Sequence, residues 1–96
     1  MPISSFTALA KAIQEKNLLK KYHLAKLGIF GSFVRGESAK DIDFYVDADP
    51  YNLHELASLK KELEQLTEKD ADIMLKKYAN PIILYRAQKD MKYVRG

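Results

Sequence analysis

Residues 30–47 read FGSFVRGESAKDIDFYVD, and this stretch decides the fold. Residues 41–47, its second half, alternate between polar and apolar, so successive side chains point to opposite faces of a strand. The apolar face holds Ile42, Phe44 and Val46. Such alternation predicts a strand with one face on the core and the other open to solvent. The apolar run 27–30 predicts a second strand, which ends in a tight turn at residues 31–32.

Helical patterns surround these two strands. Apolar residues at helical spacing predict a helix from Ser5 to about Tyr22, with Ser4 or Ser5 as N-cap. Asp49-Pro50 is typical of an N-cap followed by proline at the first helical position, and a leucine stripe follows. The stripe comprises Leu53, Leu56, Leu59, Leu63 and Leu66. Residues 71–75 predict a third strand. Asn80-Pro81 predicts a last helix that runs to about Tyr93.

The order of these elements predicts an α/β (α+β) fold: a small mixed sheet of three to four strands with helices on one face. The length of 96 residues fits one domain, residues 1–96. The chain has no cysteine, which excludes disulfides and thiolate metal sites. Its lysines are spread rather than massed, so a net charge of +3 does not predict direct binding of nucleic acid. We find neither a signal peptide nor an apolar run long enough to span a bilayer, and expect a cytoplasmic protein without membrane contact.

The chemistry-bearing residues lie between the first two strands. Gly31 lets backbone approach a phosphate, and Ser32 adds a hydroxyl and an N–H donor. Asp41 and Asp43 lie two apart on a strand, so both carboxylates face one side about 7 Å apart, which suits Mg²⁺. If the two strands pair antiparallel, the end of the first meets the start of the second. The glycine turn and the aspartates would then be neighbours.

The motif Gly31-Ser32-x-x-Arg35-Gly36-Glu37, followed by Asp41-Ile42-Asp43, resembles the signature of the minimal nucleotidyltransferases of the DNA polymerase beta-like superfamily. The resemblance is specific across residues 30–47 and looser over most of the chain. It implies the polymerase beta palm-like fold and catalysis with two Mg²⁺ ions and ATP or another nucleoside triphosphate.

The same resemblance implies roles for individual residues. The metal-binding and catalytic carboxylates would be Asp41, Asp43 and, as third member and base, Asp72. The nucleotide and its phosphates would be bound by Gly31, Ser32, Arg35 and Gly36. The acceptor would be a hydroxyl of a partner protein, because small members of the family are antitoxins of HEPN ribonuclease toxins, and some transfer AMP to a tyrosine of the toxin.

Two departures from the family pattern favour an alternative. Lys40 stands where the family usually has serine, and the connection from Gly36 to Asp41 is about two residues shorter than usual. The alternative is a weakly catalytic or non-catalytic antitoxin that neutralises its partner by occlusion. A transferase for RNA or small molecules is disfavoured, since no second domain is available to hold such an acceptor.

Several residues also have a purely structural interpretation. Asp72 could be a turn residue, and Arg35 could pair with Glu37 or another surface acid instead of contacting phosphates or the acceptor. His23 and His54 are expected on the surface. The last predicted helix has more apolar residues than one stripe of Leu84, Ala87 and Met91 can cover. The surplus is Ile82, Ile83, Tyr85 and Tyr93, which either pack in the core or form a partner interface.

Overall fold

The computed structural model describes residues 5–48 and 52–95. Its helices are α1 (Phe6–Glu15), α2 (Leu18–Lys21), α3 (Leu53–Thr67) and α4 (Pro81–Asp90), with a 3-10 turn, η1 (Lys76–Tyr78). Its strands are β1 (Lys26–Phe30), β2 (Asp41–Val46), β3 (Asp70–Leu75) and β4 (Lys92–Arg95). They form one sheet in the order β3-β2-β1-β4. The β1–β2 and β1–β4 pairs are antiparallel and β2–β3 is parallel, which confirms the mixed sheet.

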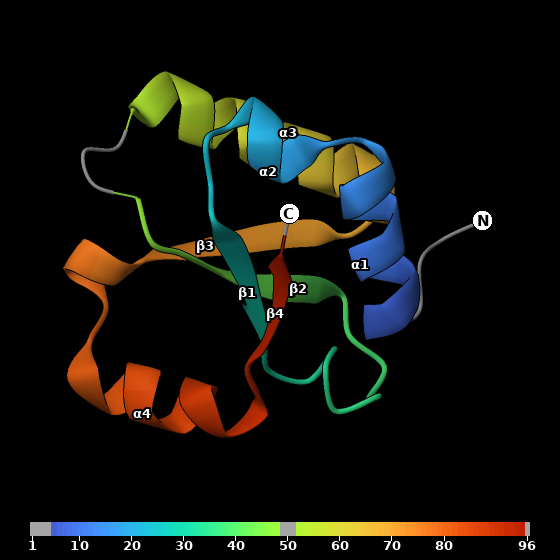
Figure 1. Ribbon diagram of the computed structural model, residues 1–96. Coiled ribbons are helices and arrows are strands. Elements are labelled where there is room, and N and C mark those ends of the chain that lie inside the picture. The colour runs from blue at the N-terminus through green and yellow to red at the C-terminus, as the bar shows by residue number, and fades with distance from the viewer. Residues whose placement is uncertain (1–4, 49–51, 96) are drawn as a thin grey trace.

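The helices form two unequal layers about this sheet. The helices α1, α2 and α3 lie together on one face, and α4 lies on the other (Figure 1). The first layer encloses the core, where Ile42, Phe44 and Val46 of β2 are fully buried as the alternation predicts. The sequence predicted helices on one face of the sheet. The structure has α4 on the second face as well, so that face is only partly open to solvent.

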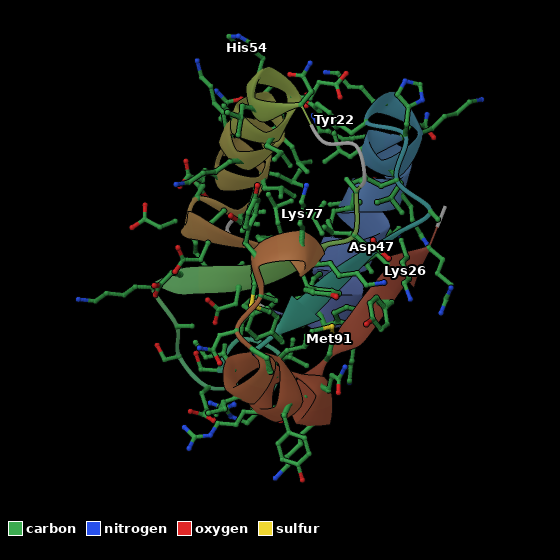
Figure 2. All side chains as sticks on the ribbon, turned by 90° about the vertical axis from the view of Figure 1, so that its left-hand side faces the viewer. Tyr22, Lys26, Asp47, His54, Lys77 and Met91 are labelled. Atoms are coloured by element: carbon green, nitrogen blue, oxygen red, sulfur yellow. The ribbon has the colours of Figure 1, made fainter. Side chains whose placement is uncertain are left out.

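Gly28 of β1 allows α4 to approach the second face. A β-carbon on Gly28 would lie 2.9 Å from the sulfur of Met91, just after α4. Figure 2 shows Met91 between α4 and the sheet. On the opposing β2, Tyr45 is only 7% exposed, so the solvent-exposed face expected for this strand is covered at this point. The close approach at Gly28 therefore fixes the end of α4 against the middle of the sheet.

The predicted helix over residues 5–22 is wrong as one element. Its N-cap is confirmed, because the Ala8 N–H donates to Ser5 Oγ at 3.2 Å. The chain then leaves the helix at Asn17, whose φ of 54° is left-handed, a conformation that asparagine tolerates better than most residues. The segment is thus two helices, and the turn between them lets the buried Leu18 and Leu19 reach the core.

The start of α3 differs from the prediction. Asp49 and Pro50 lie outside the described residues, and the helix begins at Leu53 with Asn52 as N-cap. The amide of His54 donates to Asn52 Oδ1 at 2.8 Å. Most of the leucine stripe packs inward, with Leu59 and Leu63 buried, but Leu53 is 71% exposed because it lies in the first turn, beyond the sheet.

The end of the chain corrects the last predicted helix. Asn80 caps α4 as expected, accepting from the Ile82 N–H at 2.9 Å, but the helix ends at Asp90 rather than near Tyr93. The following residues form β4, which pairs with β1 and buries Val94. Within residues 5–48 and 52–95, none of the helices combines the length and apolarity needed to cross a membrane.

Candidate active site

A left-handed turn follows β1 directly. Gly31 has a φ of +85°, which favours glycine because it has no β-carbon. The Val34 N–H donates to the Gly31 carbonyl at 3.1 Å, and the Glu37 N–H donates to the Ser32 carbonyl at 3.0 Å. A second left-handed glycine, Gly36, has a φ of +81°. Residues 32–36 are therefore a compact turn and not the start of a regular helix.

The strand register brings the predicted acidic residues to this turn. Phe30, the last residue of β1, pairs with Asp43, and Asp43 pairs with Asp72 of the parallel strand β3. A β-carbon on Gly31 would lie 2.5 Å from Oδ2 of Asp43. The predicted meeting of the end of β1 with the start of β2 is thus confirmed, and Asp72 joins them from a third strand.

Repulsion and burial both act on Asp43. Its side chain is half-buried, whereas Asp41 and Asp72 are exposed. Burial raises the pKa of the Asp43 carboxyl, and the negative charges of Asp72 and then Asp41 raise it further. The positive charge of Arg35 acts in the opposite direction. Burial and the two neighbouring acids together outweigh the effect of Arg35 on the pKa of Asp43.

Arg35 has two carboxylate partners. Its Nε lies 2.5 Å from Glu37 Oε2, and its Nη1 lies 2.6 Å from Asp90 Oδ2. The structural interpretation of Arg35, pairing with Glu37, is confirmed. The contact with Asp90, a second acid of the kind that the sequence allowed, ties the glycine turn to the last turn of α4.

Two hollows flank Asp43 and share Phe30, Asp43 and Ile83 as walls. The first, about 300 Å³, lies on the side of the glycine turn; its further walls are Gly31, Arg35, Arg86, Ala87 and Asp90. The second, about 370 Å³, lies on the side of β3 and is completed by Asp72, Ile73 and Met74. One hollow thus carries two arginines and the other carries the third acid.

Arg86 and Ile83 are among the wall residues that were not predicted as site residues. Arg86 was not singled out in the sequence, and Ile83 was named only as surplus apolar surface. A helical spacing of three and four places Ile83 and Asp90 on the side of Arg86. That spacing was visible in the sequence. Only the position of α4 against the second face of the sheet shows that these residues line the hollow beside Asp43.

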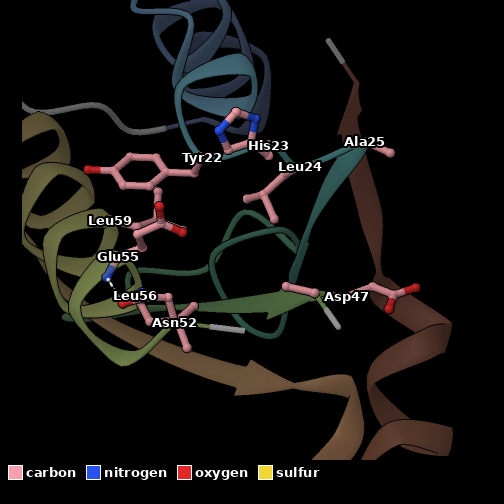
Figure 3. A pocket seen from close by; sticks show the side chains of 10 residues that line it. Tyr22, His23, Leu24, Ala25, Asp47, Asn52, Glu55, Leu56 and Leu59 are labelled. Carbon is pink, nitrogen blue, oxygen red and sulfur yellow. Dashed lines mark hydrogen bonds between the residues drawn. The ribbon is translucent and has the colours of Figure 1, made fainter. Parts of the chain in front are cut away.

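A further hollow of about 360 Å³ lies past the opposite end of β2 (Figure 3). Its walls include His23, Asp47 and Glu55. Asp47 lies beyond Val46, while Asp41 starts the strand, so this hollow is separate from the acidic residues. Lys76 contacts Asp47 at 3.4 Å. His23 and His54 are exposed, as predicted.

In the described ranges 5–48 and 52–95, no three acidic or histidine side chains are grouped so that they could hold a metal ion. The backbone register nevertheless makes Asp43 and Asp72 direct neighbours, with Asp41 two residues away on the same strand face. The metal-binding set of Asp41, Asp43 and Asp72 therefore stays a prediction, as do the phosphate-binding roles of Gly31, Ser32, Arg35 and Gly36.

Comparison with known proteins identifies the family. The polymerase beta nucleotidyltransferase family matches residues 14–95. Two proteins of Methanocaldococcus jannaschii, both provisionally named protein adenylyltransferase, are 32% and 33% identical over 84 and 88 residues. The matches cover 83% and 84% of this chain, and 86% and 88% of the relatives.

Solved structures agree on the fold. A structure titled as a minimal nucleotidyltransferase has a TM-score of 0.71 at 24% identity and covers 90% of this chain and 91% of its own. A complex of tri-AMPylated Shewanella oneidensis HEPN toxin with MNT antitoxin has a TM-score of 0.65 at 20% identity, covering 88% and 69%. The family match spans the glycine turn and all three acidic positions, so the chain belongs to the polymerase beta nucleotidyltransferase family.

Proposed function

We propose that this chain moves AMP from ATP onto a hydroxyl of a partner protein. One observation carries the proposal: Asp43 touches the space left by Gly31 and is paired in register with Asp72. The glycine turn and two acidic strand positions thus lie next to one another on the fold of a nucleotidyltransferase family. The provisional names of the two relatives from Methanocaldococcus jannaschii support a protein as the acceptor.

The chemistry of the acidic residues fits a divalent cation, because carboxylate oxygens are the ligands that Mg²⁺ prefers and Asp43 and Asp72 are neighbours in register. Burial, and after it the charges of Asp72 and Asp41, raises the pKa of Asp43, and a cation would neutralise those charges. Asp41, Asp43 and Asp72 would hold it. Bound Mg²⁺, with two ions expected, would supply charge neutralisation for the triphosphate oxygens during transfer.

The two hollows would bind different parts of the reactants. The hollow with Arg35 and Arg86 suits the negatively charged triphosphate, and the hollow with Asp72 suits the acceptor hydroxyl. The hydroxyl oxygen attacks the α-phosphorus, and its proton passes to the Asp72 carboxylate. The bond from the α-phosphorus to the bridging oxygen breaks, and pyrophosphate leaves. The Gly31 turn positions the phosphates for this in-line attack.

The biological setting we propose is that of an antitoxin, with a HEPN ribonuclease toxin as the acceptor. The Shewanella oneidensis structure supports this choice, because it is a complex of an AMPylated HEPN toxin with an MNT antitoxin. A similar toxin–antitoxin structure, with AMP-PNP, has a TM-score of 0.71 and supports ATP as the nucleotide. The cytoplasmic location expected from the sequence remains a prediction.

Neutralisation by occlusion is the second candidate. Within the described residues, no three acidic side chains are grouped so that they could hold a metal ion. A site of this kind would bind metal weakly. Lys40 also adds a positive charge directly before Asp41. Under this alternative the chain would bind its partner and block it without transferring a nucleotide.

The deciding experiment is co-expression of the chain with the product of the adjacent gene. Intact-mass spectrometry should find that product heavier by one or more AMP groups. The Asp41→Asn, Asp43→Asn double variant should remove the increment, because the α-phosphate is then neither positioned nor neutralised. Neither residue is in the apolar core, and circular dichroism would verify the fold.

Growth of the cells separates the two candidates. If the double variant loses both the increment and the protection from the partner, protection is chemical. If the double variant still protects and the wild type never leaves an increment, the transferase proposal is wrong and occlusion is correct.

A further inference from the structure

The exposed apolar surface of this protein is concentrated on one segment. Four of the five exposed large hydrophobic side chains of the described chain lie within residues 78–85. Three belong to α4: Ile82 is 65% exposed, Ile83 53% and Tyr85 66%. The fifth, Leu53, stands apart at the start of α3. A cluster of this kind commonly marks an interaction site, whereas a single exposed leucine does not.

These side chains lie on one side of α4. At 100° per residue, Tyr85, Ile82 and Ile83 span about 160° of the helix circumference. Ala87 and the half-buried Leu84 occupy the opposite side, which packs against the protein. We call the exposed side, formed by Ile82, Ile83 and Tyr85, the α4 face. Its apolar residues are not required for the internal packing of the chain.

The α4 face is continuous with the candidate active site. Ile83 forms a wall of both hollows that flank Asp43, and it is at the same time half exposed. A protein that places a hydroxyl in the hollow of Asp72 therefore enters a space bordered by Ile83. Ile82 and Tyr85 continue this surface away from the hollows, since they line neither of them.

The charged side chains around the α4 face indicate which kind of protein surface would bind there. Arg86 and Lys89 lie on the same arc of the helix, and Lys77 lies in the preceding turn η1. Within residues 5–48 and 52–95 these three cations form no ion pair, and Lys89 lies 5.1 Å from the ring centre of Tyr85. The face is thus apolar with a basic border, because Asp90 on the same arc is paired with Arg35. Its complement is an apolar surface with an acidic border.

A second copy of this chain does not meet that description. A symmetric dimer through the α4 face would oppose each basic border to another basic border, because the same patch is used twice. Like charges brought together in this way oppose association. The occupant is therefore a different protein.

We infer that the α4 face docks the acceptor protein, through an apolar patch edged by acidic side chains on that protein. This inference rests on the proposed transfer to a protein hydroxyl and names the surface that selects its acceptor. Docking there holds the acceptor beside Ile83, with its hydroxyl directed at Asp72. The α4 face sets the affinity for the acceptor and takes no part in the chemical step.

The test uses the product of the adjacent gene as probe and the double variant Ile82→Glu, Tyr85→Glu. Neither residue lines a hollow, and both are exposed, so the fold and the ATP affinity should not change. Biolayer interferometry should give a Kd at least tenfold higher than that of the wild type. The KM for the protein acceptor should rise equally, with kcat at saturating acceptor unchanged. Leu53→Glu, an equally exposed residue on α3, is the matched control and should stay within twofold.

Four results would overturn the docking surface. The first two are an unchanged Kd in the double variant and an equal rise of the Kd in Leu53→Glu. The other two are a wild type that does not bind the probe, and a wild-type dimer in sedimentation that the double substitution dissociates.

Failure of the transfer proposal can be distinguished from failure of the docking surface. Binding that the double variant weakens, without any AMP increment, supports the docking surface and rejects the transfer. An increment formed with unchanged KM supports the transfer and rejects the docking surface.

Discussion

A β-carbon on Gly31 would lie 2.5 Å from Oδ2 of Asp43, so the turn after β1 and the acidic side chain of β2 fit together only while residue 31 is glycine. Gly36 offers a comparison within the same turn. Its φ is also left-handed, but a β-carbon there would meet no atom within 4 Å. Comparing a substitution at Gly31 with the same substitution at Gly36 therefore separates the cost of backbone strain from the cost of a collision with a side chain.

Gly31→Ala should lower the free energy of unfolding more than Gly36→Ala does. Both variants incur about 1–2 kcal/mol for a left-handed non-glycine residue. Gly31→Ala also displaces Asp43, and this overpacking should lower the free energy of unfolding by a further amount of about 1–3 kcal/mol. Urea denaturation of both variants measures the difference. Equal losses would mean that Asp43 moves aside freely and that the contact is not restrictive.

ATP binding should require a divalent cation. Asp41, Asp43 and Asp72 repel a triphosphate, and the pKa of Asp43 is raised by burial and, in addition, by the charges of the other two acids. Calorimetry should give at least tenfold weaker ATP binding in EDTA than in Mg²⁺. The same affinity in both buffers would contradict a metal site at these carboxylates.

Asp72→Asn should abolish transfer while ATP affinity stays within a few fold, because a general base acts mainly in the transition state. Asp41→Asn is the comparison and should weaken metal-dependent ATP binding and transfer together. Single-turnover rates and calorimetry provide the two readouts. The structure already places Asp72 within β3 rather than in a turn, so transfer at the wild-type rate in Asp72→Asn would leave this residue only a structural role in the strand.

Acid should remove the contribution of Glu62 to stability. Lys21 Nζ donates to Glu62 Oε1 at 2.9 Å, the Tyr22 hydroxyl donates to Oε2, and these bonds join the segment of α2 to α3. They lower the pKa of Glu62, with the bond from Lys21 as the largest cause. A carboxyl with a lowered folded-state pKa stabilises the fold above its unfolded-state pKa and loses this effect as the pH falls through the folded-state pKa.

Glu62→Gln should therefore lower the urea midpoint at pH 7 by about 0.3 M, a small effect because the pair is exposed. The difference between wild type and variant should shrink as the pH falls from the unfolded-state pKa of Glu62 through its lowered folded-state pKa, below which Glu62 is uncharged like glutamine. Denaturation at pH 7, 5 and 3 follows this trend. A difference that persists at pH 3 would assign the effect to packing.

Much of the fold could be predicted because local signals were strong. Ser5 and Asn80 were recognisable as caps, and the alternation in β2 fixed which residues face the core. The break at Asn17 could not be recognised, because its left-handed conformation interrupts a pattern that stays apolar on both sides. The strand β4 follows α4 without glycine or proline, and its pairing with β1, distant in sequence, decides its structure.

The candidate site was predictable where residues were close in sequence. The turn at Gly31 and the aspartates of β2 needed only an antiparallel pair. The resemblance to a family supplied Asp72, whereas its register opposite Asp43 depends on the parallel crossover through α3. The bond between Arg35 and Asp90 and the walls formed by Ile83 and Arg86 depend on how α4 docks, which no local pattern encodes.

The strand order β3-β2-β1-β4 has a consequence for hydrogen exchange. The glycine turn and two of the acids are attached to β1 and β2, the central strands, which are hydrogen-bonded on both sides. Amides of such strands exchange slowest, because they open only when most of the domain unfolds. The outer side of α4 has no covering layer, so its amides should exchange sooner. The groups proposed for chemistry would then remain in place while the surface proposed for the partner opens and closes locally.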